Sequence, residues 1–274
     1  MRLAISHTTR YTFSGPVAHG LQRLRLTPLS WGGQSVESWA IDLEGARHEA
    51  SYDDENGNHV TLISFVPGVR EVVIACKGVV LTADNAGIVG KQRGHLPLWH
   101  FTEQTRLTRG GARMKALVAA LQEGLAAGED TLARLHALSD RVREAVVYEP
   151  GHTDVASTAE QVLEAGRGVC QDQAHVFIGA ARMLGIPARY ASGYLMMDDR
   201  VEQDASHAWA EAYVAGLGWV GFDVANAICP DARYVHLATG SDYTAAAPIT
   251  GIGYGARDEA MEVSLAVEQQ RVEQ

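Results

Sequence analysis

The chain of 274 residues has little of several features that would place it in a specialised class of protein. It has only three cysteines, an odd number without a C-x-x-C pair, which argues against a disulfide framework and a zinc cage. No apolar run reaches the roughly 18 residues that a membrane-spanning helix needs. Positive charge is also scarce, because 23 lysines and arginines face 33 aspartates and glutamates. A formal net charge of −10 therefore gives no overall attraction to nucleic acid or to an anionic membrane.

The N-terminal residues 1–11 interrupt their apolar side chains with polar ones, and so lack the apolar centre of a secretory signal. Together with the unpaired cysteines, this predicts a protein of the reducing cytoplasm. The composition is otherwise that of a globular protein, with 46% hydrophobic and 20% charged residues. The length suits one large or two modest domains.

Residues 1–82 consist of short alternating segments separated by turn residues, a pattern that predicts an antiparallel β-sandwich-like domain. The candidate strands share this alternation and cover residues 3–13, 21–26, 38–43, 60–65 and 69–81. The clearest turn is the polar run 53–58. No pattern in this domain suggests chemistry.

Residues 83–110 hold several glycines and few sustained patterns, which predicts a linker between two domains. His95, Trp99 and His100 lie in this linker. They could line a cleft, or they could pack across the interface between the domains, which is the simpler interpretation.

Residues 111–274 are predicted to form a second domain. Apolar positions at helical spacing predict helices over 112–127 and 131–147. Ser157 precedes Glu160 by three residues, a capping box that predicts a short helix ending near Gly166. Two later strands, over 232–238 and 259–268, either extend the sheet of this domain or return to the N-terminal one.

A single stretch, residues 166–175, carries the clearest chemical signal. Its glycines lead into Cys170, and from Cys170 onward apolar residues recur at three- and four-residue steps, as on one face of a helix. A thiol in the first turn of a helix lies near unpaired backbone N–H groups and the positive end of the helix dipole, and both favour the thiolate. Cys170 is therefore interpreted as a nucleophile, whereas an isolated cysteine would more simply be a buried core residue.

Two partners for this thiol follow in the order His207 and then Asp223. Each lies on a predicted strand, and Gly216-Leu217-Gly218 between them predicts a hairpin turn. Because side chains alternate faces along a strand, His207 and Asp223 share a face only if the loop has an odd number of residues or a bulge. We therefore expect such a loop.

The run GRGVCQDQAHVFIGAARMLGIPARYASGYL, followed by SHAWAEAYVAGLGWVGFD, resembles the bacterial transglutaminase-like superfamily, whose fold is related to papain-like cysteine proteases. The resemblance implies an α+β fold, with an N-terminal β-domain and a papain-like core of helices on an antiparallel sheet. It also implies a Cys-His-Asp catalytic triad, which falls on Cys170, His207 and Asp223. Two departures, Gln173 in place of an aromatic residue and Val224-Ala225 before Asn226, affect the shape of the acyl pocket.

Three other polar residues near Cys170 have simpler roles. His175 lies five residues along the helix, about 140° around its axis from the thiol, and is expected to pack or buffer. Gln171 and Asp172 are expected to bond free N–H groups at the helix start, although Gln171 could also help to bind an oxyanion. The backbone N–H of Cys170 is the simpler oxyanion donor.

These residues predict a cysteine-dependent acyl-transfer enzyme that acts on peptide or amide bonds through a thioester, most simply as a hydrolase, with no cofactor or metal. A protein-glutamine transglutaminase would use the same residues with an amine as acceptor. A non-catalytic module that binds peptides or a partner is the alternative from another class. A metal site made by Cys170, His207 and Asp223 is a third, less usual set of ligands. The predicted substrate is a peptide or protein amide, and the oligomeric state is left open.

Overall fold

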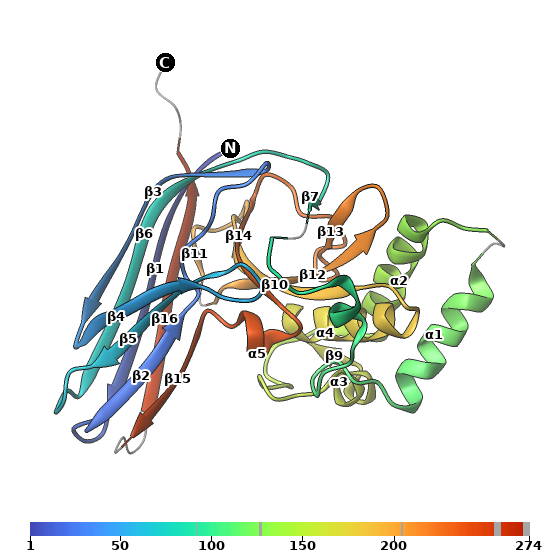
Figure 1. The fold of residues 1–274 in the computed structure, drawn as a ribbon. Helices are drawn as coiled ribbons and strands as arrows, with labels where there is room; N and C mark the ends of the chain where they lie inside the picture. The colour runs from blue at the N-terminus through green and yellow to red at the C-terminus, as the bar shows by residue number, and fades with distance from the viewer. Residues whose placement is uncertain (92, 126–127, 204, 255–258, 271–274) are drawn as a thin grey trace.

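The computed structural model describes residues 1–270 except 92, 126–127, 204 and 255–258. Three antiparallel sheets build the molecule, two in the β-rich part and one beside the helices (Figure 1). The β-rich part has one sheet in the order β11-β16-β1-β6-β3 and another in the order β15-β2-β5-β4. The third sheet, here called the core sheet, has the order β14-β10-β12-β13-β7. This mixed architecture agrees with the predicted α+β class.

The β-rich part contains the predicted strands and three strands that the sequence does not predict. They are β1 (Arg2–Phe13), β2 (His19–Leu24), β3 (Gln34–Glu44), β4 (Ala46–Asp53), β5 (His59–Phe65), β6 (Glu71–Thr82), β11 (Glu202–Gln203), β15 (Ile249–Tyr254) and β16 (Glu259–Gln269). The three strands that the sequence does not predict are β4, β11 and β15. Every residue of β4 after Ala46 is exposed, so no apolar period marks it.

The C-terminal strands answer a question that the sequence left open. The strand predicted over 232–238 is β14 (Tyr234–Gly240), which joins β10 in the core sheet. By contrast, β16 pairs along the whole of β1, from Leu3 opposite Gln269 to Phe13 opposite Glu259, and β15 pairs with β2. The predicted unit 111–274 therefore shares its last two strands with the N-terminal sheets.

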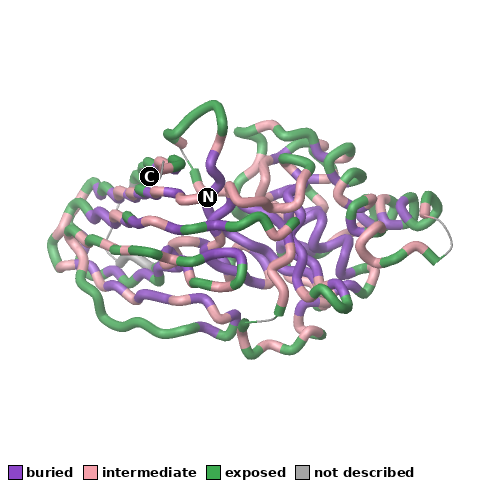
Figure 2. The backbone as a smooth tube through the Cα atoms, turned by 90° about the horizontal axis from the view of Figure 1, so that it is seen from above, coloured by how far each residue is buried: buried purple, intermediate pink, exposed green. Residues whose placement is uncertain are grey.

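One hydrophobic core connects the β-rich part with the core sheet. It gathers Ile5 and Ile74 from the N-terminal strands with Tyr194, Val235 and Leu237 of the core sheet. Figure 2 shows buried residues concentrated in the middle of the molecule and alternating with exposed ones along the outer strands. The two parts are thus packed together through apolar side chains.

The core sheet carries the helices on one side (Figure 1). Its remaining strands are β7 (Ile88–Gly90), β10 (Ala188–Leu195), β12 (His207–Val214) and β13 (Gly218–Phe222). The helices are α1 (Ala112–Gly124), α2 (Thr131–Ala145), α3 (Ala159–Ala165), α4 (Cys170–Met183), α5 (Tyr243–Ala246) and the 3₁₀ turn η1 (Leu98–Thr102). The short pair β8 (Val147–Tyr148) and β9 (Arg167–Gly168) is parallel. Among the described residues, no helix has the length and apolarity to span a membrane.

The central helix α4 differs from the expected one-faced helix. Residues Asp172 to Arg182 are buried without interruption, so α4 is enclosed on all sides. Its polar side chains have partners in other elements, as the Arg182 guanidinium donates to the Phe101 carbonyl at 3.0 Å and to the Thr108 hydroxyl at 3.1 Å.

The two longer helices begin as predicted, and the third starts one residue later. The last residues of the predicted helix 112–127 lie partly outside the described residues. The capping box of α3 consists of Thr158 and Gln161 rather than Ser157 and Glu160. Glu160 instead accepts hydrogen bonds from the backbone N–H groups of Gly111 at 2.7 Å and Arg113 at 2.8 Å, at the start of α1.

Residues 83–110, predicted as a linker, run along the core sheet and pack on it. Within them, β7 pairs with β13, and the buried ring of Phe101 meets Trp219 edge to face at 5.1 Å between centroids. His100 forms a 2.9 Å hydrogen bond with Ser241, in accordance with the packing interpretation, whereas the side chain of Trp99 is exposed. The division at residues 82 and 110 stays a prediction.

A buried ion pair crosses the core sheet. Arg189 Nε on β10 lies 2.7 Å from Glu211 Oε2 on β12, and both side chains are almost completely buried. The Arg189 guanidinium also lies 4.1 Å from the centroid of the Trp219 ring. Desolvation opposes the burial of each charge, and the opposite charge of the partner offsets this cost. Removal of one partner therefore leaves the other charge buried and uncompensated.

We therefore expect Glu211→Gln to lower the free energy of unfolding by about 3–5 kcal/mol. Urea denaturation followed by circular dichroism measures the change. Glu164→Gln is the matched control, because it breaks the exposed pair of Glu164 with Arg113 and should hardly move the urea midpoint. Equal effects of the two substitutions would contradict this assignment.

Candidate active site

Cys170 is the first residue of α4 and is held there by its approach. Gly166 ends α3 in the left-handed conformation, with φ 66°, and β9 then pairs with β8. The carboxylate of Asp172 accepts the Val169 N–H at 2.8 Å and the Thr153 hydroxyl at 2.6 Å. A side chain at Gly168 would place its Cβ 2.7 Å from the Asp172 carboxylate. The approach therefore fixes the Cys170 side chain, which is partly exposed, at the helix start.

His207 and Asp223 meet across the hairpin of β12 and β13. Val214 pairs with Gly218, which leaves a three-residue loop centred on Gly216. The odd loop confirms the prediction and makes His207 and Asp223 diagonal neighbours. The side chains touch, with His207 Nε2 at 2.6 Å from Asp223 Oδ2.

The Asp223 carboxylate is buried, with 1% exposure, and is surrounded by donors. Besides His207, its Oδ2 accepts the Tyr234 hydroxyl at 2.6 Å and the Asn226 side-chain amide at 2.7 Å. Burial alone would raise the pKa of Asp223, but the bonds and charge of these neighbours hold that pKa below its ordinary value. Asp223 is therefore a stable anion beside the imidazole.

The imidazole of His207 lies between its two candidate partners. An ionised carboxylate only accepts hydrogen bonds, so Nε2 donates to Asp223 and Nδ1 is the nitrogen left for Cys170. Burial opposes a charge on His207, but hydrogen bonds to Asp223 and Cys170, with the charges of both, raise its pKa to about 10. The ring also stacks on Trp209, with 6.3 Å between centroids. This environment suits an imidazolium next to a thiolate.

The raised pKa of His207 should be visible directly by NMR. We expect the imidazole to keep its proton well above pH 6.5, near which a free histidine titrates, and to lose it as the pH approaches 10. The stabilisation from this charge is complete below pH 6.5 and is lost as the pH rises through about 10.

In Cys170→Ala the imidazole loses one hydrogen bond and one charge, so its titration should move to lower pH. Ring-proton shifts of His207 in the two proteins provide the comparison. An unchanged titration in Cys170→Ala would mean that the thiol and the imidazole do not interact.

Of the neighbours of Cys170 on α4, Asp172 and His175 take the structural roles expected of them. His175 is completely buried, its Nε2 accepts the Tyr243 N–H at 3.1 Å, and burial lowers its pKa to about 4. Gln173, which replaces an aromatic residue, donates to the Val146 carbonyl at 2.8 Å. Within the part of the chain that the structure describes, no three His, Cys, Asp or Glu side chains form a metal-binding group.

Two residues of the site were not predicted from the sequence. Asn226 could have been noticed, because it follows Asp223 by only three residues. The two residues form a tight turn in which the Asn226 N–H donates to Asp223 Oδ1 at 3.3 Å. Tyr234 has no such signal. It reaches Asp223 from β14, the strand on the far side of β10, and only the fold brings the two together.

Known proteins resemble this chain both in its N-terminal region and in its core. The model of the transglutaminase-like superfamily matches residues 119–224, and that of the bacterial transglutaminase-like N-terminal region matches residues 3–81. An uncharacterised protein of Mycobacterium leprae, ML0607, is 29% identical over 269 residues, which is 94% of this chain and 95% of its own. Rv2569c, an uncharacterised protein of Mycobacterium tuberculosis, is 35% identical over 144 residues, or 48% of this chain and 46% of its own.

A solved structure from Cytophaga hutchinsonii, described as a "putative cysteine protease", has the same fold. Its TM-score is 0.75 at 20% identity, with 100% of this chain and 92% of that chain covered. The fold and the two matched regions define a transglutaminase-like core behind a bacterial N-terminal region. Residues 119–224 thus form a core of the transglutaminase-like superfamily, and this match supports a cysteine-dependent kind of enzyme.

Proposed function

We propose that the protein is an acyl-transfer enzyme that hydrolyses peptide or amide bonds through a thioester on Cys170. The observation that carries the proposal is the 2.6 Å contact of His207 with the buried carboxylate of Asp223, in an imidazole whose pKa the neighbouring Cys170 also raises. Such a set of residues supplies a nucleophile, a base and a group that orients the base. The superfamily match over residues 119–224 includes all three residues and supports the same roles.

The proposed reaction uses the protein's own groups throughout. The Cys170 thiolate attacks the carbonyl carbon of the amide, and the C=O π electrons move to oxygen. The backbone N–H of Cys170, at the start of α4, would stabilise the resulting oxyanion. The His207 imidazolium then protonates the departing amine, or ammonia, as the C–N bond breaks and leaves a thioester.

The second half of the reaction returns the enzyme to its starting state. Neutral His207 takes a proton from water, the hydroxide oxygen attacks the thioester carbonyl, and the Cys170 thiolate leaves. The product is a carboxylic acid. A primary amine in place of water would give a new amide instead, so the acceptor distinguishes a hydrolase from a transglutaminase.

Products formed in heavy-oxygen water with methylamine present test this proposal. The protein is incubated with a library of N-acetylated peptides that includes glutamine, and the products are analysed by mass spectrometry. We expect heavy oxygen in new carboxyl groups and little methylamide. Mainly methylamide would identify a transglutaminase, while no product beyond that of Cys170→Ala would leave the non-catalytic binding module as the better account.

The cytoplasmic location stays a prediction.

A further inference from the structure

The strand β14 is held on its outer edge by side chains of the β-rich part. Among the described strands of the core sheet, its only neighbour is β10. On the other edge, the Gln34 amide donates to the His236 carbonyl at 3.0 Å and accepts the His236 N–H at 2.8 Å. The Asn58 amide likewise donates to the Thr239 carbonyl and accepts the Thr239 N–H, both at 2.8 Å. Two amides thus take the place of a missing neighbouring strand.

Both amides are themselves fixed in the β-rich part. Gln34 and Asn58 are buried, and Gln34 also donates to the Leu29 carbonyl at 3.0 Å. Asn58 donates to Asp54 Oδ2 at 3.0 Å, and Asp54 forms a buried ion pair with Arg25 at 3.1 Å. A third contact comes from Thr82, whose hydroxyl donates to the Ala232 carbonyl. Hydrogen bonds from the β-rich part therefore hold β14 and the residues just before it in place.

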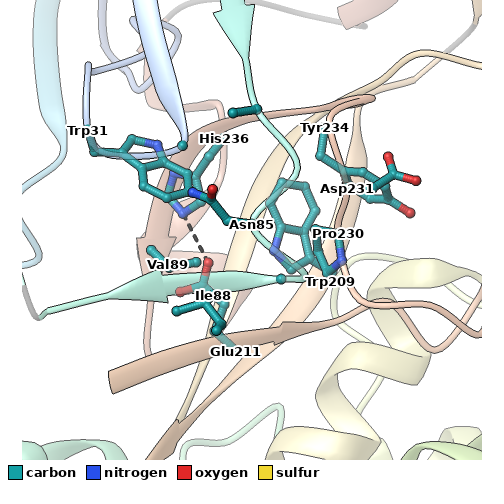
Figure 3. A pocket seen from close by; sticks show the side chains of 13 residues that line it. Trp31, Asn85, Ile88, Val89, Trp209, Glu211, Pro230, Asp231, Tyr234 and His236 are labelled. Carbon is teal, nitrogen blue, oxygen red and sulfur yellow. Dashed lines mark ion pairs between the residues drawn. The ribbon is translucent and has the colours of Figure 1, made fainter. Parts of the chain in front are cut away.

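Tyr234 is the first residue of this gripped strand and reaches the candidate active site. It is 6% exposed, and its ring meets Trp209 edge to face at 5.5 Å between centroids. Its hydroxyl donates to Asp223 Oδ2 at 2.6 Å. Figure 3 shows Tyr234 and Trp209 on the wall of a pocket that is also lined by Trp31 and His236. The Tyr234 ring thus lines this pocket, while its hydroxyl contacts the candidate active site at Asp223.

We propose that Tyr234 is a positioning residue for Asp223, and that the β-rich part acts on catalysis by holding Tyr234 through β14. This inference rests on the proposed function, because it concerns the same carboxylate. It assigns a role to the N-terminal region in which no residue pattern suggested chemistry. In this proposal the N-terminal region holds β14 in place, and Tyr234 on β14 in turn holds the Asp223 carboxylate.

The physical reason lies in the three donors on Asp223 Oδ2. The Tyr234 hydroxyl, with the Asn226 amide, turns this oxygen toward His207 and stabilises its negative charge. Without the hydroxyl, a buried carboxylate keeps its desolvation cost but loses one of its bonds, so its pKa rises. Once protonated, Asp223 no longer stabilises the imidazolium of His207 beside Cys170.

Tyr234→Phe isolates this effect, because it keeps the ring and removes only the hydroxyl. The readout is the pH profile of Cys170 alkylation by iodoacetamide. We expect the acidic limb of the profile to move upward by about one pH unit, the size of one hydrogen bond to a charged group. A merely structural tyrosine would leave the limb in place, and an unmoved limb in folded Tyr234→Phe overturns the proposal.

Gln34→Met tests the contribution of the β-rich part. It removes the amide that grips His236, and we expect the same limb to move upward, though less than in Tyr234→Phe. Gln22→Met is the matched control, since Gln22 is a buried glutamine on β2, a strand of the other N-terminal sheet. If Gln34→Met does not fold, Thr82→Val serves, because it removes only the hydroxyl that bonds Ala232.

The outcomes separate this inference from the proposed function. If both Gln34→Met and Gln22→Met leave the limb where it is in the wild type, the role of the β-rich part is overturned. If instead wild-type Cys170 reacts no faster than Cys170 in His207→Ala, the catalytic pair itself is absent and the proposed function fails. A limb that moves in Tyr234→Phe and in Gln34→Met, but not in Gln22→Met, supports the inference.

Discussion

Cys170→Ser is expected to lower the rate of amide hydrolysis by at least about 10³-fold while the fold is preserved. Serine has nearly the same shape, and position 170 begins α4 at the partly exposed surface, so the replacement fits without strain. A hydroxyl, however, holds its proton much more tightly than a thiol, and His207 would have to remove it during the attack. The heavy-oxygen assay measures the rate, and circular dichroism reports the fold.

Cys229→Ser is the matched control for this prediction. Cys229 is partly buried, and burial raises the pKa of its thiol, so it is a poor nucleophile. Its replacement should leave the rate within a few-fold of the wild type. Hydrolysis that survives in Cys170→Ser but is lost in Cys229→Ser would move the nucleophile to the other cysteine.

Asp223→Asn should be the next most damaging substitution, with a loss of about 10²–10⁴-fold in rate. Asparagine has nearly the same shape as aspartate, so the side chain still fits the buried site, although only one of its two terminal atoms can face His207, Tyr234 and Asn226. The negative charge is lost, however, and the amide can turn its NH₂ group toward His207 Nε2. The imidazole would then hold its proton on the nitrogen that faces Cys170, and so could not accept the thiol proton.

Asp198→Asn removes a carboxylate that lies on the surface, where it pairs with Arg233. It serves as the control for an unspecific effect of net charge and should leave the rate unchanged. Rates are compared at neutral pH, where the lowered pKa of Asp223 keeps the wild-type carboxylate ionised. A loss below tenfold in Asp223→Asn would contradict the assigned role.

Most of the candidate site could be predicted from local sequence patterns. The helix after Cys170 is visible in its apolar spacing, and the parity of the hairpin predicted the odd loop that brings His207 to Asp223. Both inferences need only residues that are close in sequence, where the periods of helix and strand apply. They do not depend on how the rest of the chain folds.

The parts that could not be predicted depend on contacts between distant segments. The return of β16 to β1 joins the two ends of the chain, and an alternating strand has no local signal for its partner. Tyr234 is a similar case, because its bond to Asp223 requires the order of strands in the core sheet. The extent of burial of α4 was missed because its polar residues bond backbone groups of other elements, as Arg182 does with Phe101.

The pH dependence of Cys170 alkylation by iodoacetamide, compared between wild type and His207→Ala, tests the central claim most directly. The claim is that His207, oriented by Asp223, makes the Cys170 thiol reactive. At pH 6, mass spectrometry should show alkylation of wild-type Cys170 at least tenfold faster than that of the same cysteine in His207→Ala. Equal alkylation rates at pH 6 in the two proteins would contradict the account, because Cys170 would then owe nothing to His207.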